Sequence, residues 1–142
     1  MLTDGKTPGF LISAPSSGSG KTVTTLALLR AYRSHGRAIG SFKVGPDYID
    51  PAFHTAASGR ACFNLDLWGM RTRTVESNLN TVVPDVDLVI GEGVMGLFDG
   101  ASGGGGSTAD VAVALDIPVV LVVDASGQAT SAAALVHGVD TF

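Results

Sequence analysis

Apolar residues along the chain gather in short continuous runs, and the segments between these runs are mixed in polarity. The continuous runs predict buried strands at 10–14, 38–44, 87–91 and 118–124. The segments between and after them predict helices at 21–33, 51–58, 70–80, 109–115 and 128–137. Strands that are apolar throughout and alternate with helices are typical of a parallel sheet covered on both faces. The pattern therefore predicts an α/β fold with a doubly wound, mostly parallel sheet.

Composition narrows the classes of protein that fit this pattern. The chain has 142 residues, of which 45% are hydrophobic and 15% are charged, as expected for one α/β domain or part of a larger one. A formal net charge of −4 argues against nucleic-acid or anionic-membrane binding, and no apolar run is long enough to span a bilayer. The N-terminus lacks a signal-peptide pattern, and Cys62 is the single cysteine. We expect a cytoplasmic protein that binds neither nucleic acid nor membrane.

A loop of small residues joins the first predicted strand to the helix at 21–33. It reads Ala14-Pro15-Ser16-Ser17-Gly18-Ser19-Gly20-Lys21-Thr22. Such a loop lets backbone N–H groups converge on phosphate oxygens at the positive end of a helix. We expect it to bind the phosphates of ATP, with Lys21 on the β- and γ-phosphates and Thr22 on Mg²⁺. The residues assigned to this binding are Ser17, Gly18, Ser19, Gly20, Lys21 and Thr22. The usual phosphate-loop motif, G-x-x-x-x-G-K-S/T, fits only if the loop has one extra residue. Pro15 occupies the position of the motif's first glycine, and Ala14 then takes the place of that glycine.

The loop after the second predicted strand carries both signs of charge. In a doubly wound sheet, loops at the carboxyl ends of strands face the ligand crevice, which places Lys43 near the phosphate loop. A lysine suits a developing phosphoryl anion, and the carboxylates of Asp47 and Asp50 suit Mg²⁺ or an attacking group. Lys43 is one of only three lysines, which favours a functional role. For Asp50, capping of the helix that Pro51 opens stays an alternative.

The third predicted strand ends at a second acidic position. An apolar strand that delivers a carboxylate at its carboxyl end is the Walker-B arrangement, in which the acid helps to hold Mg²⁺. Glu92 occupies that position and is one of only two glutamates. Asp99 follows a glycine-rich turn and is expected on the substrate side, although an ordinary turn aspartate is the alternative.

Several segments together resemble the cobyrinic or hydrogenobyrinic acid a,c-diamide synthases, which are glutamine-dependent amidases of corrin-ring synthesis. The matching stretches are APSSGSGKT (14–22), FKVGPDYIDPAFHTAASGR (42–60), NLDLW (64–68), GEGVMGLFDG (91–100), GSTADVA (106–112) and PVVLVVDASGQATSAAALVHG (118–138). They run in order across nearly the whole chain. Dethiobiotin synthetase shares the phosphate loop with its extra residue, but not the PDYIDP and EGVMGLFDG blocks.

The resemblance implies a P-loop NTPase fold of the dethiobiotin synthetase type and an ATP- and Mg²⁺-dependent synthetase. In such enzymes a substrate carboxylate attacks the γ-phosphate to give an acyl phosphate, and ammonia then displaces phosphate to leave an amide. The residues carried over as catalytic are Lys43, Asp47, Asp50 and Asp99. Those carried over as metal ligands are Thr22, Asp47 and Glu92, and Tyr48 is placed against the corrin polycarboxylate.

Two departures from the family pattern matter. Position 91 is glycine where the family usually has an apolar residue, and we expect this to loosen the end of the strand. Family members are also much longer, because the synthetase domain continues and a glutaminase domain follows to supply ammonia from glutamine. Residues 1–142 are therefore expected to be the N-terminal portion of the synthetase domain, without the glutaminase domain, and a homodimer is left open.

Two other interpretations stay open. A regulatory or partitioning-type P-loop ATPase would act as a nucleotide-switched binding module. Its dimeric members carry a second lysine five positions before the motif lysine, where this chain has Ser16. The isolated piece is alternatively inert, with an exposed sheet edge.

The remaining cysteine, histidine and tryptophan side chains are assigned mainly to structure. We expect Cys62 to be a small buried side chain rather than a nucleophile. His35 suits a helix end, and His54 suits either a substrate contact or a packed or solvated position. Trp68 is expected in the core.

Overall fold

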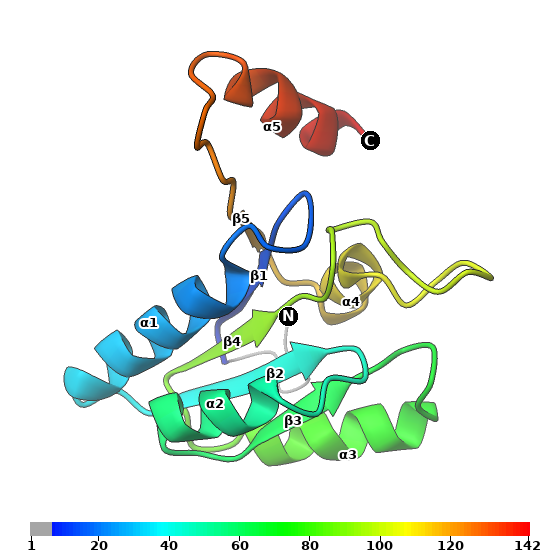
Figure 1. The fold of residues 1–142 in the computed structure, drawn as a ribbon. Helices are drawn as coiled ribbons and strands as arrows, with labels where there is room; N and C mark the ends of the chain where they lie inside the picture. The colour runs from blue at the N-terminus through cyan, green and yellow to red at the C-terminus, as the bar shows by residue number, and fades with distance from the viewer. Residues whose placement is uncertain (1–6) are drawn as a thin grey trace.

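Five parallel strands form one sheet with the order β3-β2-β4-β1-β5 in the computed structural model, which describes residues 7–142 (Figure 1). The strands are β1 (Gly9–Ser13), β2 (Ile39–Val44), β3 (Cys62–Leu65), β4 (Leu88–Glu92) and β5 (Val119–Leu121). The helices are α1 (Lys21–Ser34), α2 (Asp50–Ser58), α3 (Thr72–Val82), α4 (Thr108–Leu115) and α5 (Ala132–Thr141). The predicted α/β fold with a parallel sheet is confirmed.

The strand order brings three loops to one edge of the sheet. β4 lies between β1 and β2, so Ile12 of β1 and Lys43 of β2 both pair with Glu92 of β4. The carboxyl ends of these strands are therefore neighbours, and the loops that follow them surround the same point. Residues 21, 43 and 92, which are far apart in the chain, meet there.

Alternate residues of each strand face opposite layers of helices. Leu11 packs in a core cluster with residues of α3 and α4, while the next residue, Ile12, packs with Leu29 of α1. The members of the larger cluster are Leu11, Phe42, Val44, Leu65, Val75, Leu79, Val82, Val83, Val89, Val111, Leu115 and Ile117. Those of the smaller cluster are Ile12, Leu29, Ile39 and Ile90. The sheet is thus covered on both faces, as the continuous apolar strands predict.

The structure differs from the predicted elements in four places. β3 was not predicted as a strand, because Cys62–Leu65 contains a polar Asn64 and only Leu65 is fully buried. β5 is shorter than predicted, and α5 begins at Ala132 rather than 128. The prediction that Asp50 caps the helix is wrong, since Asp50 is the first helical residue and Ile49 is the N-cap, with no side-chain capping bond.

Gly91 does not loosen β4, so that expectation is also wrong. The residue lies inside the strand and pairs with Leu11 on one side and Phe42 on the other. A Cβ at position 91 would lie 2.3 Å from Cζ of Phe42. The glycine therefore makes room for a fully buried phenylalanine ring in the middle of the sheet.

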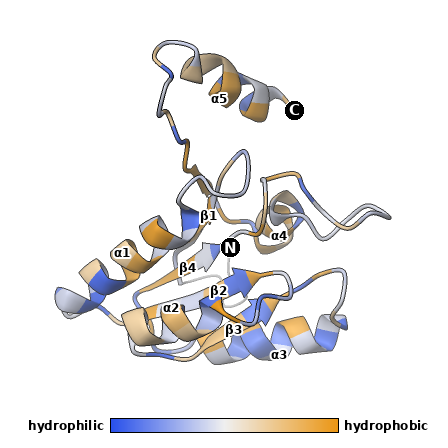
Figure 2. Ribbon diagram, viewed as in Figure 1, coloured by the Kyte–Doolittle hydropathy of each residue, from blue (hydrophilic) through white to orange (hydrophobic). Residues whose placement is uncertain are grey.

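The C-terminal helix α5 stands apart from the sheet (Figure 1), and none of its residues is buried. It is nevertheless largely apolar (Figure 2). Directly after α5, the ring of Phe142 lies 4.7 Å from the ring of Phe98, measured between centroids.

Among residues 7–142 no helix is both long and apolar enough to cross a membrane. The first six residues, on which the expectation of no signal peptide partly rests, lie outside the described part of the chain.

Candidate functional site

The phosphate loop connects β1 to α1 and exposes its backbone. Gly18 and Gly20 take left-handed conformations with φ of 79° and 92°, which glycine adopts without strain. Gly20 is the N-cap of α1, and no side chain caps the first turn. The amide groups at this positive helix end are therefore free of a side-chain acceptor, as anion binding requires. A cavity of about 290 Å³ adjoins the loop and is lined on its other side by Asp124, Ser126, Gln128 and Leu135.

Lys21 lies at the start of α1 and its ammonium is held only by backbone oxygens. Nζ donates to the carbonyl oxygen of Ser16 at 3.0 Å and to that of Met95 at 2.5 Å. No carboxylate of residues 7–142 forms an ion pair with it. Burial, together with the nearby charge of Lys43, lowers the pKa of Lys21 below its usual range. Lys21 therefore has a desolvated positive charge without an anionic partner.

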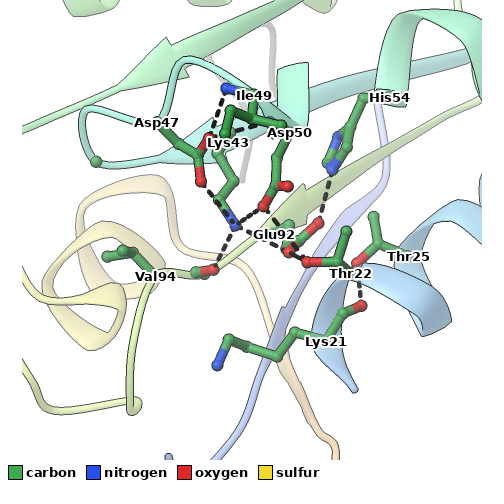
Figure 3. A network of polar contacts seen from close by, with 12 residues as sticks. Lys21, Thr22, Thr25, Lys43, Asp47, Ile49, Asp50, His54, Glu92 and Val94 are labelled. Atoms are coloured by element: carbon green, nitrogen blue, oxygen red, sulfur yellow. Dashed lines mark hydrogen bonds and ion pairs between the residues drawn. The ribbon is translucent and has the colours of Figure 1, made fainter. Parts of the chain in front are cut away.

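Lys43, by contrast, is the centre of a buried ionic cluster (Figure 3). Its Nζ lies 2.7 Å from Oδ2 of Asp50 and 2.8 Å from Oε1 of Glu92. Thr22 donates from Oγ1 to the same Glu92 oxygen at 2.5 Å. The cluster thus joins α1, β2, α2 and β4 at the carboxyl edge of the sheet.

Hydrogen bonds keep the members of this cluster charged. Burial would raise the pKa of the Glu92 carboxyl, but hydrogen bonds from His54, Lys43 and Thr22 outweigh it and lower this pKa to about 2. Burial would likewise lower the pKa of Lys43, but Asp50 and Glu92 raise it above the usual range. Lys43 and Glu92 are therefore a mutually stabilised ion pair.

Asp47 has a different position from Asp50, although the sequence groups them together. Oδ1 of Asp47 accepts the backbone N–H groups of Ile49 at 2.8 Å and Asp50 at 3.0 Å, which shapes the turn into α2. Its other oxygen is 3.9 Å from Nζ of Lys43. Burial would raise the pKa of Asp47, but these backbone bonds and Lys43 lower it. Asp50 is therefore the closer carboxylate to Lys43, and it also lies 3.4 Å from Oγ1 of Thr22.

The two residues expected on the substrate side, Tyr48 and Asp99, form no ion pair or side-chain hydrogen bond with Lys43, Asp50 or Glu92 in the described part of the chain. Tyr48 is 92% exposed. Asp99 accepts the backbone N–H of Gly96 at 2.8 Å, as a turn aspartate does. Asp99 also lines a cavity of about 320 Å³ with Pro46, Trp68 and Met95.

Three side chains that the sequence assigned to structure have mixed outcomes. The core placement of Trp68 is wrong, since it is 69% exposed. His35 is the C-cap of α1, as expected. Cys62 is half-buried rather than buried as predicted, and this partial burial raises the pKa of its thiol to about 11, which argues against a nucleophilic role.

Sequence reasoning missed the role of His54 in the cluster. Its side chain is fully buried, and Nε2 lies 2.6 Å from Oε2 of Glu92. The signal that would have found it is its spacing from Asp50, since residues four apart share one helix face.

The residues at this edge are suited to Mg²⁺ when phosphate is present. Thr22, Asp50 and Glu92 offer hydroxyl and carboxylate oxygens, which Mg²⁺ prefers, and magnesium sites take few protein ligands beside phosphate and water. Within residues 7–142, no group of three or more histidine, cysteine or acidic side chains is arranged to hold a metal alone.

The fold is α/β with a five-stranded parallel sheet, and the site combines the glycine-containing loop before α1 with an ionic cluster at the same edge of the sheet. No protein-family model matches the chain. Curated relatives do: the chain is 55% identical over 135 residues to hydrogenobyrinate a,c-diamide synthase of Brucella anthropi and 55% identical over 130 residues to that of Rhizobium meliloti. It is 50% identical over 137 residues to cobyrinate a,c-diamide synthase of Syntrophotalea carbinolica.

These alignments cover 92% to 95% of the chain but only 30% or 31% of each relative. The chain thus spans about a third of the length of the curated proteins it matches. The resemblance to the corrin a,c-diamide synthases is confirmed over that length.

Proposed function

We propose that this chain is part of an ATP- and Mg²⁺-dependent amide ligase that acts on the a and c carboxylates of a corrin, cobyrinic or hydrogenobyrinic acid. The observation that carries the proposal is the meeting of Lys21, Lys43 and Glu92 at one sheet edge. The relatives' names supply the substrate class. The proposed enzyme is a glutamine-dependent carboxylate-amide ligase.

Lys21 would bind the phosphates of ATP. Its ammonium is desolvated and held by two carbonyl oxygens, so phosphate oxygens would replace weaker partners with charged ones. The amide groups of 17–20 and the uncapped start of α1 would donate to the same phosphates.

Thr22, Glu92 and an aspartate would hold Mg²⁺, which would neutralise charge on the transferred phosphoryl group. Distance favours Asp50 over Asp47 for this role, because Asp50 lies closer to both Lys43 and Thr22. Asp47 would then act mainly by shaping the loop that presents Asp50.

Lys43 would stabilise the anionic phosphoryl group during transfer. A carboxylate oxygen of the corrin bonds to the γ-phosphorus, and the bond to the β-γ bridging oxygen breaks to release ADP. Ammonia then attacks the acyl carbon, phosphate leaves, and loss of a proton gives the amide. Tyr48 and Asp99 would lie on the corrin side of this edge.

Ammonia would come from glutamine through a glutaminase domain outside this chain. The relatives are about three times as long as the matched segment, which leaves room for such a domain.

The direct test is ADP release by purified protein containing this chain, with Mg·ATP, ammonium chloride and hydrogenobyrinic or cobyrinic acid. Ammonium makes the assay independent of glutamine hydrolysis. We expect ADP release to depend on the corrin and to match the amide formed. Equal ATP hydrolysis with and without corrin, accompanied by ATP-dependent dimerisation, would instead support the partitioning-type ATPase.

A further inference from the structure

His54 is a buried polar side chain that the proposed chemistry leaves without a role. It lies on α2 with an exposed fraction of 0%, on the far side of the Glu92 carboxylate from Lys43 (Figure 3). Its Nδ1 has no hydrogen-bond partner among residues 7–142. A buried nitrogen without a partner is costly, so an apolar residue would pack here at lower cost. The other ring nitrogen must therefore explain why this position holds a histidine.

The two oxygens of Glu92 have separate sets of partners. Oε1 accepts from Thr22 at 2.5 Å and from Lys43 at 2.8 Å. Among residues 7–142, Oε2 has one partner, Nε2 of His54 at 2.6 Å. The terminal torsion of glutamate has a broad energy profile, so the plane of the carboxylate is set by its hydrogen bonds. His54 is the contact that fixes this plane from the side away from the phosphate loop.

We propose that His54 is a positioning residue that holds Oε2 of Glu92 and thereby keeps Oε1 directed at Thr22 and Lys43. The inference rests on the proposed function in one respect: Oε1 is then the oxygen presented to Mg²⁺. Histidines that hydrogen-bond a ligating carboxylate in this manner typically change metal affinity by about 10- to 100-fold when replaced.

The position of His54 on α2 adds a geometric argument. Asp50 and His54 are one helical turn apart and lie on the same helix face. Asp50 contacts Lys43, and His54 contacts Glu92, so one helix holds both members of the Lys43–Glu92 pair. A shift of α2 would therefore move both contacts together.

A matched pair of substitutions tests the proposal. In His54→Gln the side-chain amide nitrogen takes the place of Nε2 and can still donate to Glu92. In His54→Asn the amide nitrogen takes the place of Nδ1 and does not reach the Glu92 carboxylate. We expect His54→Gln to keep the Mg²⁺ dependence of ATP binding within about threefold of wild type, and His54→Asn to weaken it about 10- to 100-fold. Equal weakening in both variants, or wild-type behaviour in both, would overturn the proposal.

A second measurement does not depend on nucleotide. The chain has only two glutamates, Glu76 and Glu92, so labelling glutamate with ¹³C at the side-chain carboxyl gives two signals, and Glu92→Gln assigns them. The Glu92 signal should move in His54→Asn and stay close to wild type in His54→Gln, while the Glu76 signal is unchanged in both.

The two measurements separate the proposals. If the wild-type protein does not bind Mg·ATP but the Glu92 signal follows the pattern above, the proposed function fails and the positioning by His54 holds. If Mg·ATP binds and the Glu92 signal is the same in the wild type and His54→Asn, the positioning role is contradicted.

Discussion

Lys21 and Lys43 are two buried lysines at the same sheet edge, and they have opposite surroundings. The exposed fractions of the two residues are similar, at 8% for Lys21 and 3% for Lys43. Lys43 is paired with two carboxylates, and its pKa is raised. Lys21 is held by two carbonyl oxygens, and its pKa is lowered. Both lysines are buried, so the opposite directions of their pKa shifts come from their different hydrogen-bond and ion-pair partners.

The comparison indicates two different tasks for the same residue type. Lys43 already has two anionic partners, so its charge is compensated in the folded protein before any nucleotide binds. Lys21 lacks an anionic partner within residues 7–142, so a phosphate would stabilise it more than it would Lys43. Replacing Lys43 should therefore mainly lower the stability of the fold, and replacing Lys21 should mainly weaken nucleotide binding.

The largest effect should come from Lys43→Met. The change leaves the buried Glu92 and the half-buried Asp50 without their cation, and breaking a buried pair typically costs about 3–5 kcal/mol. Urea unfolding measures the loss, and adding Glu92→Gln to the same protein should recover part of it. If Lys43→Met unfolds at the wild-type urea concentration, the pair does not stabilise the fold.

The next effect is the acid dependence of stability. The pKa of Glu92 is about 2 when folded, against an ordinary value of 4.5. The ionised Glu92 therefore contributes up to about 3 kcal/mol to the free energy of unfolding. This contribution is complete above pH 4.5 and is lost as the pH falls towards 2. Urea unfolding free energies across this range should fall more steeply for the wild type than for Glu92→Gln. Parallel curves would assign the acid sensitivity to other carboxylates.

Lys21→Ala should affect binding rather than folding. Loss of charge-assisted bonds to phosphate is expected to weaken Mg·ATP binding about 100-fold, or about 3 kcal/mol. Stability should change little, because Lys21 forms no ion pair within residues 7–142. Calorimetric titration measures the affinity, and Arg37→Ala, at an exposed side chain, is the control. Wild-type affinity in Lys21→Ala would contradict the assignment of the phosphate loop.

The smallest effect concerns the strand that carries Glu92. Gly91→Ala forces a methyl group against the ring of Phe42 and should destabilise the fold by about 1–3 kcal/mol. Gly103→Ala is the matched control, because a Cβ there has open space, and it should change stability by less than about 0.5 kcal/mol. Thermal unfolding of both variants checks the difference. A neutral Gly91→Ala would show that the sheet can shift around Phe42.

Four of the five strands and most of the candidate site could be predicted from the sequence. Continuous apolar runs and the loops that follow them predict the parallel strands and the meeting of Lys21, Lys43 and Glu92. β3 was missed because one strand of four residues at the sheet edge buries too little apolar surface to produce a run.

The sequence alone could not predict which side chains contact one another across the fold. Asp47 and Asp50 look alike in the chain, but the turn uses one for backbone bonds and presents the other to Lys43. His54 acquires its partner, Glu92 of β4, only when α2 packs against α1 and β2. Gly91 likewise makes sense only beside Phe42, which is 49 positions earlier in the chain and adjacent in the sheet.

Transfer of oxygen from substrate to phosphate is the measurement that tests the central claim most directly. The corrin acid is labelled with ¹⁸O in its carboxyl groups and incubated with Mg·ATP, ammonium chloride and protein containing this chain. An acyl phosphate requires the released phosphate to carry one ¹⁸O for each amide formed. Phosphate without ¹⁸O, released while amide accumulates or in the absence of any amide, would contradict the account.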